Sequence, residues 1–138
     1  MTFFEWSPQL DVHIPAMNEE HRWLISLMNK LHDLCAAKAD KAVVGAALEE
    51  LGKATVKHFQ DEEAVMARMN YPKLEHHKKL HAQLLTKFGA HVESFKASGA
   101  LTPEFFHFLK FWLSSHIQGI DMQYGDFANV HPTLARTA

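Results

Sequence analysis

The stretch HFQDEEAVMARMNYPKLEHHKKLH, residues 58–81, predicts two helices joined by a tight break. The break falls at Asn70, Tyr71 and Pro72, because the residue before a proline avoids the α-helical region of backbone angles. Apolar residues recur on both sides of the break at alternating steps of three and four, which is typical of amphipathic helices. Since a short connection favours antiparallel neighbours, the stretch predicts a helical hairpin.

Signals for helix ends elsewhere in the chain predict four helices in all. Asn18 and Asp40 are good N-cap residues, Gly99 is a typical helix stop, and Pro103 suits a first helical turn. We therefore expect an all-α chain, folded as an antiparallel up-down-up-down four-helix bundle in a single domain over residues 1–138. The expected parts are an N-terminal arm over 1–16, helices over about 18–38, 41–69, 72–97 and 103–121, and a C-terminal tail.

The composition is that of an ordinary globular protein except for its histidines. A net charge of -2 offers no basic surface for nucleic acid, and no run of about 18 apolar residues suits a membrane span. Cys35 has no second cysteine to pair with, and residues 1–10 lack the pattern of a secretory signal, so a cytoplasmic protein is expected. Eleven histidines in 138 residues is far above ordinary usage, and histidine is the commonest metal ligand.

Polar residues interrupt the apolar stripes of the predicted helices. Glu62 occupies such a position, where a lone ionised carboxylate carries a desolvation cost of several kcal/mol. Buried charges are tolerated when they are paired or bound to metal. A single buried histidine is usually a hydrogen-bonded core residue, but here the pattern recurs on all four helices, at His21, His58, His77, His81 and His116. The recurrence predicts a metal site in the bundle interior.

The predicted topology brings these positions to a similar depth near one end of the bundle. The start of the first helix, the end of the second, the start of the third and the end of the fourth meet there. Asp121 is a further candidate, but it lies five residues after His116, about 140° away on a regular helix. It reaches the site only if the last helix unwinds or ends, which Gly119 allows. The other histidines are predicted to be structural or surface residues: His13, His32, His76, His91, His107 and His131.

At these residues the chain resembles the hemerythrin family, in its single-domain bacterial form. The matching positions are His21, His58 to Glu63, Met66, Tyr71, Pro72, His77, His81, His116, Ile117 and Asp121. The resemblance covers nearly the whole chain and fills every ligand position of the family. The chain departs from the family pattern at Asn18 and Glu20, where aspartate and glutamine are frequent, which affects helix capping and the surroundings of the ligands.

The resemblance implies a centre of two non-haem iron ions joined by an oxo or hydroxo bridge. It assigns His77, His81 and His116 to one iron, His21 and His58 to the other, and Glu62 and Asp121 to both. One coordination position on the two-histidine iron stays open, as ligand binding requires. The implied function is reversible dioxygen binding for storage, delivery or scavenging, by a monomer that is not an enzyme. By position, an apolar oxygen pocket is expected from Phe59, Trp112, Leu113 and Ile117.

Other functions remain open on the sequence alone. Five imidazoles with only two carboxylates favour holding dioxygen over cleaving it, but turnover of peroxide or nitric oxide at the same irons is an alternative. A sensor of oxygen or redox state is another, and a structural zinc or iron-storage bundle is a fourth. If the chain delivers oxygen, an oxygen-consuming enzyme is the expected recipient.

Overall fold

The computed structural model describes residues 3–130, and every regular element among them is helical. The long helices are α1 (Pro15–Ala36), α2 (Lys41–Arg68), α3 (Leu74–Ser98) and α4 (Pro103–His116). A short 3₁₀-helix, η1 (Pro8–Leu10), lies in the arm, and a π-helix, η2 (Ile117–Asp121), joins α4 to α5 (Met122–Val130).

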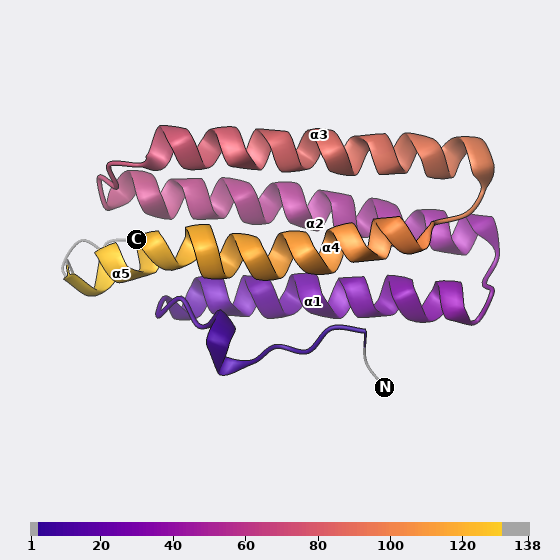
Figure 1. The fold of residues 1–138 in the computed structure, drawn as a ribbon, viewed down its shortest axis with the longest axis horizontal. Helices are drawn as coiled ribbons and strands as arrows, with labels where there is room; N and C mark the ends of the chain where they lie inside the picture. The colour runs from indigo at the N-terminus through magenta and orange to yellow at the C-terminus, as the bar shows by residue number, and fades with distance from the viewer. Residues whose placement is uncertain (1–2, 131–138) are drawn as a thin grey trace.

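The helices run up, down, up and down, with α4, η2 and α5 together forming the fourth member of the bundle (Figure 1). This confirms the predicted fold class. The start of α1, the end of α2, the start of α3 and α5 lie at one end, as the metal-site prediction requires (Figure 1). Among residues 3–130, no helix is both long and apolar enough to cross a lipid bilayer.

The predicted start of the first helix is wrong by about one turn. Pro15, not Asn18, opens α1, and the N-cap position falls to Ile14. The Asn18 side chain instead reaches back to the arm, where its Oδ1 accepts from the Val12 backbone N–H at 3.0 Å. Its Nδ2 donates to Asp11 Oδ1 at 2.7 Å. Asn18 is therefore a residue that fixes the arm, so the arm ends before the predicted residue 16.

Other helix ends follow local chemistry more closely. Gly99 takes a φ of 80° and ends α3, and the Thr102 hydroxyl accepts from the Phe105 N–H at 3.2 Å to cap α4. Asp40 holds the N-cap position of α2, but its side chain makes no capping hydrogen bond. Pro72 lies in the turn ahead of Leu74 and not in the first turn of α3, which corrects that prediction.

The last helix neither unwinds nor ends at Asp121. It widens into the π-helix η2 and continues as α5 to Val130, so the predicted end at residue 121 is wrong. A π-turn bonds residue i to i+5, which brings residues five apart onto one face. The Gly119 carbonyl accepts from Gln123 Nε2 at 2.8 Å. The predicted C-terminal tail is therefore helical as far as it is described, and His131 lies outside the described residues.

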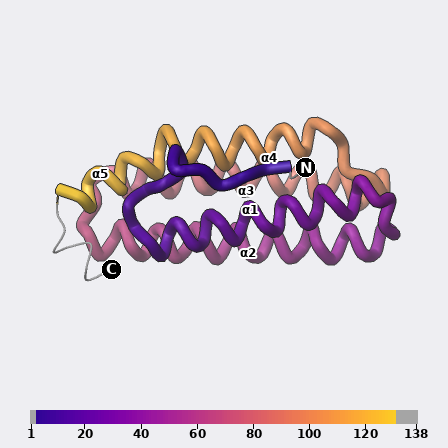
Figure 2. The backbone as a smooth tube through the Cα atoms, turned by 90° about the horizontal axis from the view of Figure 1, so that it is seen from below, coloured from indigo at the N-terminus to yellow at the C-terminus, as the bar shows by residue number. Residues whose placement is uncertain are grey.

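The N-terminal arm folds back along the bundle against α1 and α4 (Figure 2). The side-chain amide of Asn29 in α1 holds the arm through two hydrogen bonds to the Phe4 backbone, one to its N–H and one to its carbonyl, each 2.8 Å long. Lys110 of α4 donates to the Phe3 carbonyl at 3.2 Å. The Trp6 ring lies under the Arg22 guanidinium at 4.2 Å, which also holds the arm against α1. The arm thus covers the side of the bundle where α1 and α4 meet.

Gly125→Ala is expected to destabilise the fold, because the arm passes too close to α5 for a side chain. A Cβ on Gly125 would lie 2.3 Å from the Val12 carbonyl oxygen, which is backbone and cannot swing aside. We expect a loss of about 1–3 kcal/mol, typical of overpacking, measured by urea unfolding. Gly89→Ala is the control, since a Cβ there meets nothing within 4 Å. Equal stability of the Gly125 variant and the wild type would contradict this close packing.

Candidate metal centre

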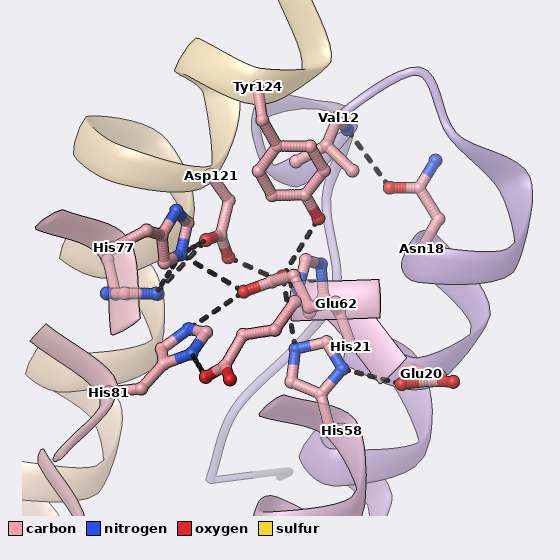
Figure 3. Close-up of polar contacts among 12 residues, drawn as sticks. Val12, Asn18, Glu20, His21, His58, Glu62, His77, His81, Asp121 and Tyr124 are labelled. Atoms are coloured by element: carbon pink, nitrogen blue, oxygen red, sulfur yellow. Dashed lines mark hydrogen bonds and ion pairs between the residues drawn. The ribbon is translucent and has the colours of Figure 1, made fainter. Parts of the chain in front are cut away.

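The structure brings all seven predicted ligand side chains together, from all four members of the bundle (Figure 3). His21 comes from α1, His58 and Glu62 from α2, and His77 and His81 from α3. His116 ends α4, and Asp121 ends η2. Every one of these side chains is buried. The π-turn solves the spacing problem, because His116 Nε2 and Asp121 Oδ1 lie 3.0 Å apart.

The seven residues form two overlapping groups, within each of which the donor atoms lie within 4.8 Å of one another. The larger group has three histidines and the smaller has two, and Glu62 and Asp121 belong to both. The groups are Glu62, His77, His81, His116 and Asp121, and His21, His58, Glu62 and Asp121.

Each shared carboxylate turns one oxygen toward each group. Glu62 Oε1 lies 2.9 Å from His81 Nε2, in the larger group. Glu62 Oε2 lies 3.4 Å from His58 Nε2, in the smaller. Asp121 does the same, with Oδ1 at 3.0 Å from His77 Nε2 and Oδ2 at 3.3 Å from His21 Nε2. Two carboxylates placed in this way can each span a pair of cations.

The donor atoms of the site are placed as cation ligands and not as hydrogen-bond partners. The Nε2 atoms of His21 and His81, both Asp121 oxygens and Glu62 Oε1 are buried and lie close to one another, but none of them makes a hydrogen bond of acceptable geometry among the described residues. The His77 and His116 Nε2 atoms face each other at 3.2 Å. An unpaired buried polar atom is costly, and five imidazoles with two carboxylates are a donor set that suits iron or zinc.

The charges of the site are strongly coupled. Burial lowers the pKa of His58, but the Glu62 charge and the hydrogen bond to Glu20 outweigh it, and the pKa rises to about 10. Burial also opposes protonation of His77, yet its contacts with Asp121 and Glu62 raise that pKa to about 9. Burial alone would raise the pKa of Glu62, but the neighbouring His58 charge holds it well below its ordinary value. Positive charge is therefore favoured at this place.

Two carboxylates outside the seven hold ligand histidines by their far nitrogens. Glu20 Oε1 lies 2.7 Å from His58 Nδ1, and Glu63 Oε2 lies 2.8 Å from His81 Nδ1. A carboxylate in this position fixes the ring orientation and leaves Nε2 free for metal. The departure from the family pattern at Glu20 thus supplies an acceptor for His58.

Tyr124 is a residue of the site that sequence reasoning missed. Its hydroxyl donates to Glu62 Oε2 at 2.8 Å, and its ring is fully buried (Figure 3). Burial first, and then the Glu62 and Asp121 charges, raise the pKa of Tyr124 well above its ordinary value, so it remains a donor. The available signal was its position three residues after Asp121, on one helix face, but the sequence alone predicts an irregular tail there.

Tyr124→Phe is expected to weaken the site without changing its shape. The substitution removes the donor to Glu62, and a hydrogen bond to a charged group contributes about 1.5–3 kcal/mol. We expect a loss of that size in the unfolding free energy of the metal-free protein, measured in urea. Tyr71→Phe is the matched control. The Tyr71 ring lies 6.4 Å from the Tyr124 ring, so the same hydroxyl is removed nearby, while the hydrogen bond from Tyr124 to Glu62 is kept. Equal losses in the two variants would argue against a specific role of Tyr124.

The described histidines outside the site have other surroundings, as predicted. The His32 ring stacks on Phe3 at 4.6 Å, and His91 packs at 5.3 Å from Phe105. The side chains of His13, His76 and His107 are exposed. None of these belongs to either donor group.

Comparisons with known proteins agree with this architecture. The family model described as Hemerythrin HHE cation binding domain matches residues 12–128. A bacteriohemerythrin of Stenotrophomonas maltophilia is 29% identical over 131 residues, covering 95% of this chain and 85% of that protein. A myohemerythrin of Riftia pachyptila is 34% identical over 122 residues, covering 88% of this chain and 90% of its own.

Solved structures show the same fold. The structure of a wild-type hemerythrin has a TM-score of 0.82 and 27% identity, covering 96% of this chain and 98% of that chain. A point mutant of hemerythrin gives a TM-score of 0.84 at 26% identity, covering 98% of this chain and 99% of its own. With a family match that spans most of its length and a buried cation-binding geometry, the chain belongs to the hemerythrin family.

Proposed function

We propose that this protein binds dioxygen reversibly at a non-haem di-iron centre. The observation that carries the proposal is the pair of carboxylates, Glu62 and Asp121, each with one oxygen toward a three-histidine group and one toward a two-histidine group. Hemerythrin relatives carry a di-iron centre that binds oxygen, and the donor groups here suit two iron ions.

The proposed ligands divide unequally between the two ions. His77, His81 and His116 would hold one iron, and His21 and His58 would hold the other, so the second would have one protein donor fewer. Glu62 and Asp121 would be ligands of both. A pair of ferrous ions held by these residues would supply the two electrons needed for reversible dioxygen binding. The two-histidine group, with fewer protein donors, would be the side that accepts a ligand, as in other metal sites that bind a substrate.

Apolar side chains next to the site exclude water from it. Phe59, Trp112, Leu113 and Ile117 are all buried, and the Phe59 ring stacks on His81 with 3.8 Å between centroids. Trp112 meets Phe59 edge to face at 5.8 Å. We propose these four residues as the oxygen pocket. A dry lining slows proton entry and favours release of dioxygen over its reduction.

The surroundings of the site favour binding over turnover. Glu63 is engaged by His81 at 2.8 Å and Glu20 by His58 at 2.7 Å, so each orients a ligand and neither is a free general base. Tyr124 is already committed as a donor to Glu62. We propose a carrier or scavenger and not an enzyme. A monomeric state, a cytoplasmic location and an oxygen-consuming recipient remain predictions.

Anaerobic reduction of iron-loaded protein, followed by oxygen titration under absorbance, tests the proposal. We expect two irons per chain and an oxy spectrum that appears with oxygen and fades on its removal over repeated cycles. Steady consumption of oxygen or peroxide without a stable oxy spectrum would instead favour an enzyme. A single ion per chain, or zinc alone after growth with ample iron, would contradict the di-iron centre.

A further inference from the structure

The candidate metal centre is closed to solvent, so dioxygen needs a route through the protein. The least buried ligand, His116, is only 7% exposed, and Glu62 and Asp121 are 0% exposed. Phe59 and Trp112 shield the site from the side facing the middle of the bundle. The route must therefore pass between side chains that move.

A large apolar groove runs along the outside of the bundle between α2 and α3, which lie side by side (Figure 1). It encloses about 870 Å³ and exposes mainly apolar surface. Gly52 of α2 and Leu85, Phe88 and Val92 of α3 form part of its walls. Dioxygen is apolar and partitions readily into such surroundings.

A small internal void lies directly beneath the metal centre. Its walls are Thr55, Leu84, Phe88, Phe108 and Trp112, and it is too narrow to hold a water molecule in this conformation. Thr55 precedes His58 by three residues, Leu84 follows His81 by three, and Trp112 precedes His116 by four. These spacings are close to one helical turn, about 5 Å along each axis. The void is thus one layer below the ligands. Trp112 lines the void and packs against Phe59, whose ring stacks on the ligand His81.

Phe88 separates the groove from the void, since its side chain lines both. It is 7% exposed. The Phe88 ring faces Gly52 of α2, where an added Cβ would lie 3.2 Å from the ring. The glycine leaves room for the ring, and Phe88 is the residue that lines both the groove and the void. Side chains in packed interiors do change rotamer without unfolding of the backbone.

We propose that dioxygen enters from this groove past Phe88 and reaches the metal centre through the void beside Trp112. This inference rests on the proposed function, which supplies the reason for an apolar gas to reach the site. Most of the exposed surface of the groove is apolar, although Glu49, Lys53, Lys57 and Lys96 also line it. The part of the path that selects for a small apolar diatomic molecule is therefore the passage past Phe88 and the void behind it. Phe88 determines access and does not touch the bound ligand.

A second cavity offers a polar rival route at the end of the bundle. It encloses about 310 Å³ and is lined in part by Lys73, His76 and the ligand His77. Lys73 donates to Gln123 Oε1 at 3.1 Å across this region. A charged entrance of this kind suits water or anions better than dioxygen. Gln123→Ala, which breaks the bond, therefore tests the rival.

The kinetic test compares Phe88→Leu with the wild type in the iron-loaded protein. A smaller side chain lowers the barrier for entry and for exit alike, so association and dissociation rates should both rise by about tenfold, equivalent to about 1.4 kcal/mol. The dissociation constant should stay the same. The rates are measured by stopped flow and flash photolysis. Phe95→Leu is the matched control, because Phe95 lies on the same helix and lines the groove but not the void.

Xenon-pressurised crystals give a second measurement that needs no oxygen chemistry. Apolar cavities bind xenon, so Phe88→Leu should show xenon between Thr55, Leu84 and Trp112, whereas Phe95→Leu should not. Xenon confined to the outer groove in the Phe88 variant would overturn the proposal. The measurement stands even if the wild type fails to bind dioxygen reversibly, a failure that would contradict the proposed function alone.

Four kinetic outcomes would also overturn the proposal. Unchanged rates in Phe88→Leu would show that oxygen enters elsewhere. A change in dissociation alone would mean that Phe88 acts on the bound ligand. Equal acceleration in Phe95→Leu would indicate general loosening of the bundle, and acceleration in Gln123→Ala without any in Phe88→Leu would assign entry to the polar cavity.

Discussion

Glu62→Ala is expected to remove nearly all iron from the protein. Glu62 belongs to both donor groups, with an oxygen turned toward each. Loss of the Glu62 carboxylate therefore weakens the binding of both ions together. The affinity for iron should fall by more than the factor of about 10 to 100 that is lost when a residue that only orients a ligand is removed. Iron per chain, measured by elemental analysis after gel filtration, should fall from two to a small fraction of that.

Two control substitutions separate this effect from damage to the fold. Glu49→Ala makes the same chemical change on the outer face of α2, where Glu49 pairs with Lys53 at 3.0 Å. His107→Ala removes an exposed imidazole of α4 that belongs to neither donor group. Both should keep the wild-type iron content. A Glu62 variant that is folded by circular dichroism and still holds two irons would contradict the assignment of Glu62 to both ions.

The metal-free and iron-loaded proteins are expected to respond to pH in opposite directions between about pH 6.5 and 10. Without metal, the pKa of His58 is raised from its ordinary 6.5 to about 10 and that of His77 to about 9. A raised pKa stabilises the fold fully below the unfolded value, and this stabilisation is lost as the pH rises through the folded value. The metal-free protein should therefore lose stability on going from pH 6.5 toward 10.

At acidic pH the carboxylates decide the stability of the metal-free protein. The pKa values of Glu62 and Asp121 are lowered in the fold, so their contribution is present above their ordinary values and lost as the pH falls through the folded ones. The iron-loaded protein differs, because metal binds neutral imidazole and competes with protons. It should gain stability from pH 6.5 upward and release iron on acidification.

Urea unfolding midpoints at pH 6.5 and 9.5, with and without a chelator, measure both responses. We expect the midpoint of the chelated protein to fall and that of the loaded protein to hold or rise. A His58→Gln variant should reduce the slope in the chelated protein, because it removes an imidazole whose pKa the fold raises to about 10. Parallel responses of the loaded and chelated proteins would show that these imidazoles do not bind the metal.

Much of the fold follows from local chemistry that can be read in the sequence. The stop at Gly99 and the start at Thr102 and Pro103 depend on backbone angles and a capping bond within a few residues. The apolar stripes predict which faces are buried, and the buried Glu62 within one of them predicts the metal site. These inferences need no knowledge of distant parts of the chain.

The errors fall where distant contacts override local preference. Asn18 is a good N-cap residue, but its amide gains more from the arm at Val12 and Asp11, and Pro15 opens the helix instead. No helix-breaking residue pattern around Asp121 predicts the π-turn that carries it. We infer that the gain from joining buried donors on three other helices makes the widened turn favourable.

The sequence by itself determined the class of fold, the approximate extents of the four long helices and the identity of six polar residues in the interior, because periodicity and residue chemistry act over one or two turns. Only the tertiary structure decided which carboxylate oxygen faces which histidine group, that Tyr124 donates to Glu62, and that Phe88 lies between an outer groove and an inner void. These features arise where helices far apart in the chain pack together, and packing depends on the shapes of all the facing side chains at once.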